Sequence, residues 1–324
     1  MNCEIKGKNV NVLMKCGVYH ISDKTLEVRT MCDRAKLAKS SITEDAKNPY
    51  AIFDEKMQEN YLSKNELMER LNLAIEREEF RVYYQPIVDL HTGEIVAAEA
   101  LARWVTPEYG VVSPEVFIPT LEESGMIAAV DLQMEKSVKG FLENRDQEGL
   151  PIVPIDMNLS WKDFCNTDII KQVIHNLKEM NYPKGMIRVE VTESSYASIV
   201  GENREILQTM KDFGVKLLVD DFGNGYSSFS TIRDFDFDMI KLDKGFIQKI
   251  GKSEKSDNII SILIHLGHQI GSEVVAEGVE TKEQADFLLE LGCDYIQGYY
   301  YYKPMPEDEF AQILDMKRAK AMVQ

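Results

Sequence analysis

The chain has 324 residues, 44% of them hydrophobic, and a net charge of −17 at pH 7. This acidic balance argues against polymeric nucleic acid or an anionic membrane surface as partner, but it leaves room for a small phosphorylated ligand that metals and a few local cations receive. No apolar run is long enough to span a bilayer, and Val10 to Cys16 is too short and interrupted for a signal peptide. The five scattered cysteines favour reduced thiols, so composition predicts a cytoplasmic protein without membrane insertion.

The first part of the chain predicts a small α+β segment. Val10–His20 has the pattern of a strand pair, Glu27–Ser40 that of an amphipathic helix, and Asn48–Phe53 that of a last strand. This is too little chain for an independent core. We therefore expect residues 1–62 to be the remnant of a larger domain, and residues 63–324 to form a second, complete domain.

The second domain begins with a helix and two strands. Lys64–Glu79 has the apolar spacing of an amphipathic helix, and Phe80–Val88 reads as the strand that follows it. A tight turn at Thr92-Gly93 leads into the next strand, Glu94–Ala102. Because a parallel crossover needs a dozen or more residues, these two strands are predicted to be antiparallel.

Six further apolar runs are spaced for helical crossovers between parallel strands. These runs are Ile152–Asn158, Met186–Val191, Lys216–Asp221, Asp238–Asp243, Glu273–Glu277 and Asp294–Gln297. With the first pair they make eight strands. The predicted fold class is therefore α/β, a (β/α)8 TIM-like barrel whose first strand is antiparallel.

Acidic residues lie at or just beyond the ends of these apolar runs. They are Glu99, Glu190, Glu193, Asp220, Asp221, Asp243, Glu277 and Glu280. The C-terminal ends of barrel strands meet at one mouth, where carboxylates held close together repel one another. Divalent cations such as magnesium, calcium or manganese relieve this repulsion, so the pattern predicts a metal-dependent enzyme.

The pair Asp220-Asp221 is the most specific of these signals. Neighbouring residues of a regular strand face opposite ways, so both aspartates serve one site only where the strand breaks. Gly223 and Gly225 are expected to supply that break. The alternative is an acidic loop followed by serine caps.

Two other segments leave two interpretations open. Glu99, Leu101 and Arg103 share one face of a strand, which is either part of the site or an exposed edge. Asn158 is either a neutral oxygen ligand or a residue that begins a loop.

The last acidic segment also has an alternative. Glu280 is either a site residue or an acid at a helix N-terminus capped by Thr281, and this alternative is weaker for Glu277. Lys241 lies inside an apolar strand beside Asp243, and a buried lysine is costly unless it is paired. We therefore place Lys241 in the acid cluster.

Taken together, these motifs resemble the EAL family. The resemblance covers about residues 64 to 318 and is carried by Gln85-Pro86-Ile87, Glu99-Ala100-Leu101, Asn158-Leu159-Ser160, Glu190-Val191-Thr192-Glu193, Asp220 to Ser228, Lys241-Leu242-Asp243, Ala276 to Thr281 and Gln297-Gly298-Tyr299. Active members of the family are phosphodiesterases that linearise cyclic di-GMP to pGpG. Their fold is a (β/α)8 barrel with an antiparallel first strand.

The resemblance implies a site for two Mg²⁺ or Mn²⁺ ions. Its implied ligands are Glu99, Asn158, Glu190 and Asp220 for one ion, and Asp220, Asp221 and Glu277 for the other. Because Ca²⁺ is larger and more loosely coordinated, we expect it to inhibit.

The resemblance also implies roles for the remaining residues. Lys241 would position the attacking water, with Gln297 and Glu280 near it, and Glu193 would hold the loop Phe222–Ser228. The implied substrate-binding residues are Gln85, Leu101, Arg103 and Asp243.

The N-terminal segment resembles the last third of a GGDEF domain without its signature loop, so no cyclase activity is expected. Relatives also imply a homodimer. The main prediction is cyclic di-GMP hydrolysis; the alternatives are a non-catalytic cyclic di-GMP receptor and a general metal phosphohydrolase acting on other diesters.

Overall fold

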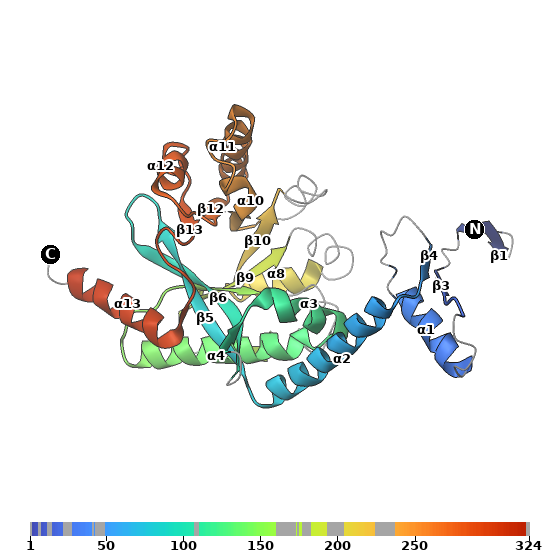
Figure 1. Cartoon of the computed structure of the whole chain (residues 1–324). Helices are drawn as coiled ribbons and strands as arrows, with labels where there is room; N and C mark the ends of the chain where they lie inside the picture. The colour runs from blue at the N-terminus through green and yellow to red at the C-terminus, as the bar shows by residue number, and fades with distance from the viewer. Residues whose placement is uncertain are drawn as a thin grey trace. The chain divides into compact units, whose positions relative to one another are not determined.

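The computed structural model describes residues 2–5, 8–11, 15–21, 28–40, 42, 49–106, 110–159, 173, 175–176, 183–192, 204–223 and 237–321. The chain forms two compact units, Met1–Leu73 and Ala74–Gln324 (Figure 1). The junction between them falls within one helix, α2 (Glu55–Glu76).

In its described residues, the first unit contains two small sheets, one helix that packs on a sheet, and most of α2. Strands β1 (Asn2–Ile5) and β2 (Lys8–Asn11) form an antiparallel hairpin. Strand β3 (Cys16–Val18) pairs in parallel with β4 (Tyr50–Ile52), and α1 (Val28–Ser40) packs against both. The helix and the last strand were predicted. The strand pair within Val10–His20 is wrong, because β2 and β3 each pair with a different partner. The assignment of this unit to a GGDEF-like remnant stays a prediction.

The second unit is built on a closed barrel, as the sequence predicted. Its strands are β5 (Phe80–Asp89), β6 (Ile95–Thr106), β8 (Ile155–Asn158), β9 (Ile187–Thr192), β10 (Lys216–Phe222), β11 (Met239–Leu242), β12 (Glu273–Glu277) and β13 (Tyr295–Gln297). They follow one another in parallel from β6 to β13, and β5 closes the barrel by pairing antiparallel with both β6 and β13.

Two short strands extend the sheet beyond the barrel. Strand β7 (Gly110–Val112) adds to β6, and β14 (Met305–Pro306) adds to β5. Neither was predicted, because segments this short carry too few residues to show a period.

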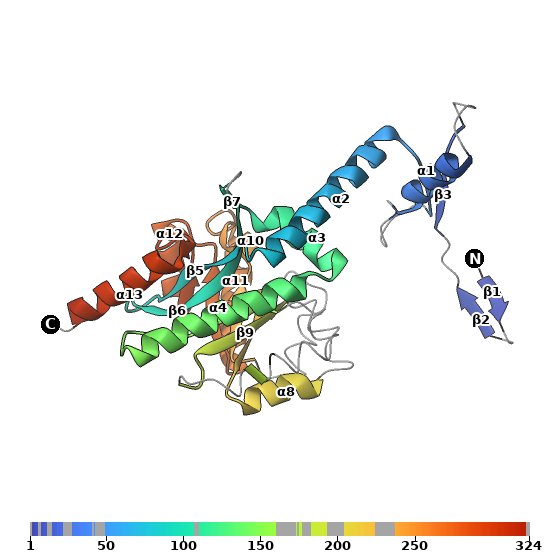
Figure 2. The same cartoon turned by 90° about the horizontal axis from the view of Figure 1, so that it is seen from below.

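Helices cover the outside of the barrel. They are α3 (Pro114–Ser124), α4 (Ile127–Gln147), α8 (Arg204–Asp212), α10 (Lys244–Ile247), α11 (Glu254–Gln269), α12 (Lys282–Glu290) and α13 (Glu307–Ala321). Helices α4 and α13 pack against β5, α8 against β10 and α11 against β12. Figure 2 shows α4 running along the strands of this unit. Among the described helices, none is both long enough and apolar enough to cross a bilayer.

The inside of the barrel is filled in layers. Side chains at alternate positions of a strand share a face, and one interior layer is apolar. It consists of the fully buried Ile87, Ala97, Leu218, Met239 and Val275. This layer closes the barrel below the C-terminal ends of the parallel strands, so any chemistry in the interior lies at that mouth.

Candidate active site

Above the apolar layer, each barrel strand contributes one polar side chain. We call this set the polar ring; its members are Gln85, Glu99, Asn158, Glu190, Asp220, Lys241, Glu277 and Gln297. On the parallel strands the ring residue comes two positions after the layer below, as Glu99 follows Ala97. On β5 the order is reversed, with Gln85 two positions before Ile87, because this strand runs the other way.

Lys241 forms the centre of the ring. Its ammonium nitrogen lies 3.1 Å from Glu99 Oε2, 2.8 Å from Glu190 Oε1 and 2.6 Å from Glu277 Oε1. The lysine is fully buried. A buried ammonium is stable only with such partners, so the prediction that Lys241 belongs to the acid cluster is confirmed.

Amide side chains hold both carboxylate oxygens of Glu99. Gln297 Nε2 donates to Glu99 Oε2 at 2.6 Å and to Gln85 Oε1 at 3.2 Å, and Asn158 Nδ2 donates to Glu99 Oε1 at 2.9 Å. Gln85 in turn donates to the carbonyl of Tyr302 at 3.2 Å. These contacts join β5, β6, β8 and β13 in one hydrogen-bonded network and leave little freedom to the Glu99 carboxylate.

The charges of the ring shift its pKa values. Burial would lower the pKa of Lys241, but Glu190, Glu277 and Glu99 raise it well above its usual value. Burial would likewise raise the pKa of Glu99, but Lys241, Gln297 and Asn158 bring it below the usual value. Lys241 and Glu99 therefore both stay charged in the folded protein.

The negative charges of Glu190 and Glu277 are not fully balanced by Lys241. Burial and the Glu99 carboxylate raise the pKa of Glu190 well above its usual value. Burial, with Asp220 adding to it, raises the pKa of Glu277 to about 8. One ammonium thus faces more negative charge than it can balance.

The Asp220-Asp221 pair lies at a bulge in β10. Val219 pairs with Ile240 and Phe222 with Leu242, so two aspartates oppose one residue of β11. Asp221 has φ 55°, a left-handed conformation that few residues other than glycine adopt. The expected strand break is present, but Asp221 itself provides it, ahead of Gly223. Partial burial and the Asp220 carboxylate raise the pKa of Asp221 to about 6.

A buried ion pair beneath the ring was missed by the sequence reasoning. Arg188 donates to both carboxylate oxygens of Asp156, one contact measuring 2.8 Å, and each residue lies two positions before a ring member on its strand. Polar residues at alternate positions in IDMN and IRVE were the available signal. The pair anchors β8 to β9 just below Asn158 and Glu190.

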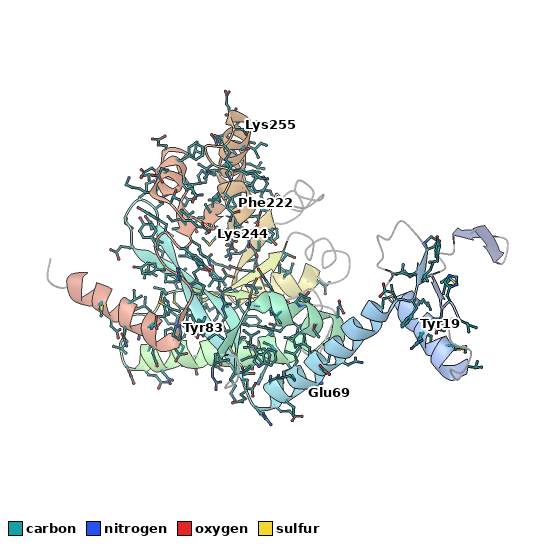
Figure 3. The ribbon with its side chains drawn as sticks, in the orientation of Figure 1. Tyr19, Glu69, Tyr83, Phe222, Lys244 and Lys255 are labelled. Carbon is teal, nitrogen blue, oxygen red and sulfur yellow. The ribbon has the colours of Figure 1, made fainter. Side chains whose placement is uncertain are left out.

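Other predicted residues lie around the mouth. Arg103 is half-buried on β6, and Leu101 precedes it on the same strand. The guanidinium carbon of Arg103 lies 5.8 Å from the centre of the ring of Tyr83, a residue labelled in Figure 3. Asp243 follows β11 and caps α10 by accepting a hydrogen bond from Gly245 N at 2.8 Å. Their substrate-binding roles stay predictions.

One predicted residue, Glu280, lies apart from this network. Glu280 is exposed and directly precedes the cap of α12, where Thr281 and Gln284 form a reciprocal capping box. The alternative proposed for this segment, a capped helix N-terminus, is therefore present. Glu193 and most of the loop Phe222–Ser228 lie outside the described residues.

The donor chemistry of the ring fits hard divalent cations. Carboxylate and amide oxygens are their usual ligands, and the buried oxygen Gln297 Oε1 accepts no hydrogen bond from the described residues. In the described part of the chain, no group of three or more His, Cys, Asp or Glu side chains is arranged as it stands to hold an ion. The Glu99, Glu190 and Glu277 carboxylates instead converge on Lys241.

Comparison with known proteins agrees with this geometry. The chain is 32% identical over 249 residues to the cyclic di-GMP phosphodiesterase PdeL of Escherichia coli, covering 77% of this chain and 69% of that protein. It is 34% identical over 237 residues to the cyclic di-GMP phosphodiesterase RocR of Pseudomonas aeruginosa, covering 73% and 60%. The solved structure of the PaMucR phosphodiesterase in complex with c-di-GMP superposes with a TM-score of 0.71 at 31% identity, covering 76% of this chain and 99% of that one.

Other curated relatives are much longer than the match. The chain spans between 30% and 41% of the length of three of them. The model of the EAL domain matches residues 68–304, which include the whole polar ring. The chain therefore belongs to the EAL domain family.

Proposed function

We propose that this protein is a metal-dependent phosphodiesterase that hydrolyses cyclic di-GMP to linear pGpG. The observation that carries the proposal is the polar ring, in which four carboxylates, three amides and a lysine occupy the same level of the barrel. Two relatives that are 32% and 34% identical to this chain are named as cyclic di-GMP phosphodiesterases. The fold alone would not support the activity, because barrels host many reactions.

The ring residues are the proposed ligands of two Mg²⁺ or Mn²⁺ ions. Glu99, Asn158, Glu190 and Asp220 would hold one ion, and Asp220, Asp221 and Glu277 the other. When bound, such ions lower the pKa of a coordinated water and offset the negative charge of a phosphodiester. Burial and the neighbouring carboxylates together raise the pKa values of Glu190 and Glu277, and this uncompensated negative charge supports the assignment.

Lys241 has two proposed tasks. Its contacts with Glu99, Glu190 and Glu277 keep these carboxylates pointed into the barrel before substrate arrives. During the reaction its ammonium is proposed to orient the attacking water by donating a hydrogen bond. Gln297 supports the same arrangement, since it holds the Glu99 oxygen that faces Lys241.

Substrate recognition is proposed to begin at Arg103. Its guanidinium lies beside Tyr83 at the mouth and offers paired N–H donors that match a phosphate. A protein with net charge −17 can thus receive an anionic dinucleotide, because the ions and Arg103 reverse the field locally.

The test is incubation of the purified full chain with cyclic di-GMP and Mn²⁺, followed by chromatography of the products. We expect pGpG, with little turnover when Ca²⁺ is the sole cation. Binding of cyclic di-GMP without pGpG formation would favour the receptor alternative. Equal rates with cyclic di-GMP and bis-p-nitrophenyl phosphate would favour a general phosphohydrolase.

A further inference from the structure

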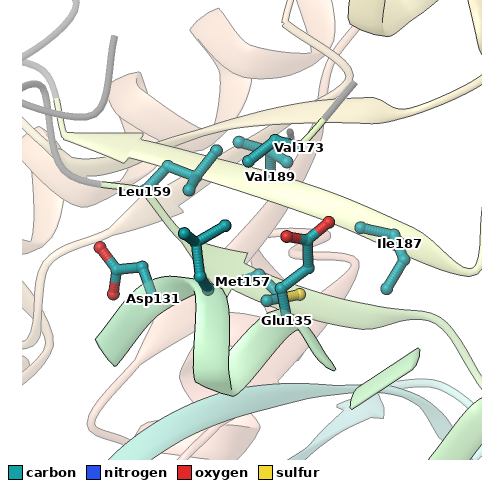
Figure 4. Close-up of a pocket in the computed structure, with 8 residues that line it drawn as sticks. Asp131, Glu135, Met157, Leu159, Val173, Ile187 and Val189 are labelled. Carbon is teal, nitrogen blue, oxygen red and sulfur yellow. The ribbon is translucent and has the colours of Figure 1, made fainter. Parts of the chain in front are cut away.

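A buried carboxylate, that of Glu135 on α4, lies on the outside of the barrel, away from the polar ring. Met157 on β8 and Ile187 and Val189 on β9 alternate with the interior residues of their strands, so they face outward toward α4. With other side chains they line a small cavity of about 20 Å³ (Figure 4). Its lining residues are Asp131, Leu132, Glu135, Met157, Leu159, Val173, Ile187 and Val189.

Glu135 is the unusual member of this lining. Its side chain reaches from α4 toward β9, between apolar neighbours (Figure 4). Only 7% of the residue is exposed, and its Oε2 accepts one hydrogen bond, from Asn176 Nδ2 at 3.1 Å. Its Oε1 is buried and accepts none among the described residues. Burial raises the pKa of Glu135 to about 7.

No cation of the described chain is close enough to pair with Glu135. Lys139 lies one turn further along α4 and lowers the pKa of Glu135 through its charge, but its ammonium lies 3.9 Å from Glu143. A buried carboxylate oxygen without a donor is costly. Within the described part of the chain, Glu135 Oε1 therefore lacks the donor that its burial calls for.

Glu135 also lines a larger groove. It has a volume of about 430 Å³, within the range of small-molecule sites. Its lining shares Leu132 and Glu135 with the inner cavity and adds Ile75, Glu78, Ala129, Gln133, Lys136, Lys139 and Asn176. Glu135 thus lies where an apolar cavity meets a polar groove.

We propose that this groove binds a small molecule that carries a protonated primary amine and a short alkyl end. The ammonium would donate to Glu135 Oε1, and the end of the alkyl chain would enter the inner cavity. That cavity holds little more than one water-sized group, so only one or two carbons fit there. The rest of the ligand lies in the groove. This inference is independent of the proposed phosphodiesterase activity.

The test uses n-butylamine as the probe and the methyl group of Met157 as the reporter. The full chain is labelled with [¹³C]methyl-methionine, and the Met157 signal is assigned with Met157→Leu. At about pH 8, where Glu135 is ionised, we expect n-butylamine to shift this signal saturably. The neutral analogue n-butanol should bind at least tenfold more weakly, and butyrate should not bind.

Two variants separate the carboxylate from the cavity. Glu135→Gln keeps the shape but loses the charge, and it should weaken n-butylamine binding at least tenfold. Asp146→Asn, exposed three turns further along the same helix and outside both linings, should bind like the unmodified chain. The proposal is overturned if the Met157 signal does not move, if n-butanol binds as well as n-butylamine, or if Glu135→Gln retains the affinity. The n-butanol comparison needs no variant and therefore does not depend on how Glu135→Gln folds.

Discussion

Glu99 and Glu135 are buried to the same extent, each with 7% of its surface exposed, but their pKa values move in opposite directions. Around Glu99, Lys241 and two amides overcome the effect of burial and lower the pKa. Around Glu135, burial prevails over one amide and a distant lysine, and the pKa rises to about 7. The fate of a buried carboxylate therefore depends on which partners the fold brings to it.

The difference follows from where the two residues lie in the fold. Glu99 lies within β6 at the level of the polar ring, to which the seven other barrel strands also bring polar side chains. Glu135 is on the inner face of one helix, and its neighbours on β8 and β9 are the outward, apolar residues. Glu99 therefore has charged and amide partners, whereas Glu135 is surrounded mainly by apolar side chains.

The largest expected effect comes from changing the charge balance of the ring. Asp220→Asn should remove metal binding and turnover together, because a ligand proposed to bridge both ions loses its charge. We expect kcat to fall roughly a thousandfold, equivalent to about 4 kcal/mol. Isothermal titration with Mn²⁺ and a cyclic di-GMP assay measure the two effects. Asp286→Asn, on the exposed face of α12, is the matched control.

Lys241→Met should make the surroundings of Glu99 resemble those of Glu135. Without the ammonium, three carboxylates lose their cation, and turnover should fall by roughly 10² or more while cyclic di-GMP binding persists. The variant should also unfold at lower temperature without metal, by an amount that Mn²⁺ partly restores. Near-normal kcat would show that the lysine does not act on the attacking water.

Glu135→Gln should remove the pH dependence that Glu135 gives to the free energy of unfolding. The folded pKa of about 7 lies above the ordinary value of 4.5, so the acid contributes stability in its neutral form. That contribution is complete below about pH 4.5 and is lost as pH rises through 7. Relative to Glu135→Gln, the unmodified chain should lose about 3 kcal/mol of unfolding free energy between pH 5 and 9. Urea unfolding of both proteins across that range measures the difference, and parallel curves would contradict the assignment.

Thr281→Ala should have the smallest effect and leave both carboxylate environments intact. The threonine hydroxyl accepts from Gln284 N at 3.3 Å in the capping box of α12. Its loss should cost about 1 kcal/mol of unfolding free energy with little change in turnover. A large loss of kcat would instead place this helix terminus, and Glu280 before it, in the chemistry.

Much of the barrel and its site could be predicted from the sequence. Apolar runs of buried strands are distinct, and the short turn at Thr92-Gly93 correctly made the first strand antiparallel. Lys241 was recognised because a lysine within an apolar strand needs buried acids. Local patterns could not give the pairing of β3 with β4, since residues far apart in the chain decide it.

Side-chain detail within the site was harder to predict. The bulge at Asp221 depends on the register between β10 and β11, which no local pattern contains. The Asp156–Arg188 pair was visible as alternating polar residues but carried no known motif. Glu135 looks like any acid of an amphipathic helix until the apolar faces of β8 and β9 are packed against it.

The central claim is that the polar ring directs water to a phosphodiester bond of cyclic di-GMP. The most direct measurement is mass spectrometry of the products formed by the full chain with Mn²⁺ in water enriched in ¹⁸O. We expect pGpG that carries one ¹⁸O in its terminal phosphate, formed at least roughly a hundredfold more slowly by Lys241→Met and Asp220→Asn under the same conditions. Recovery of intact cyclic di-GMP from the unmodified protein, despite demonstrated binding, would contradict the account.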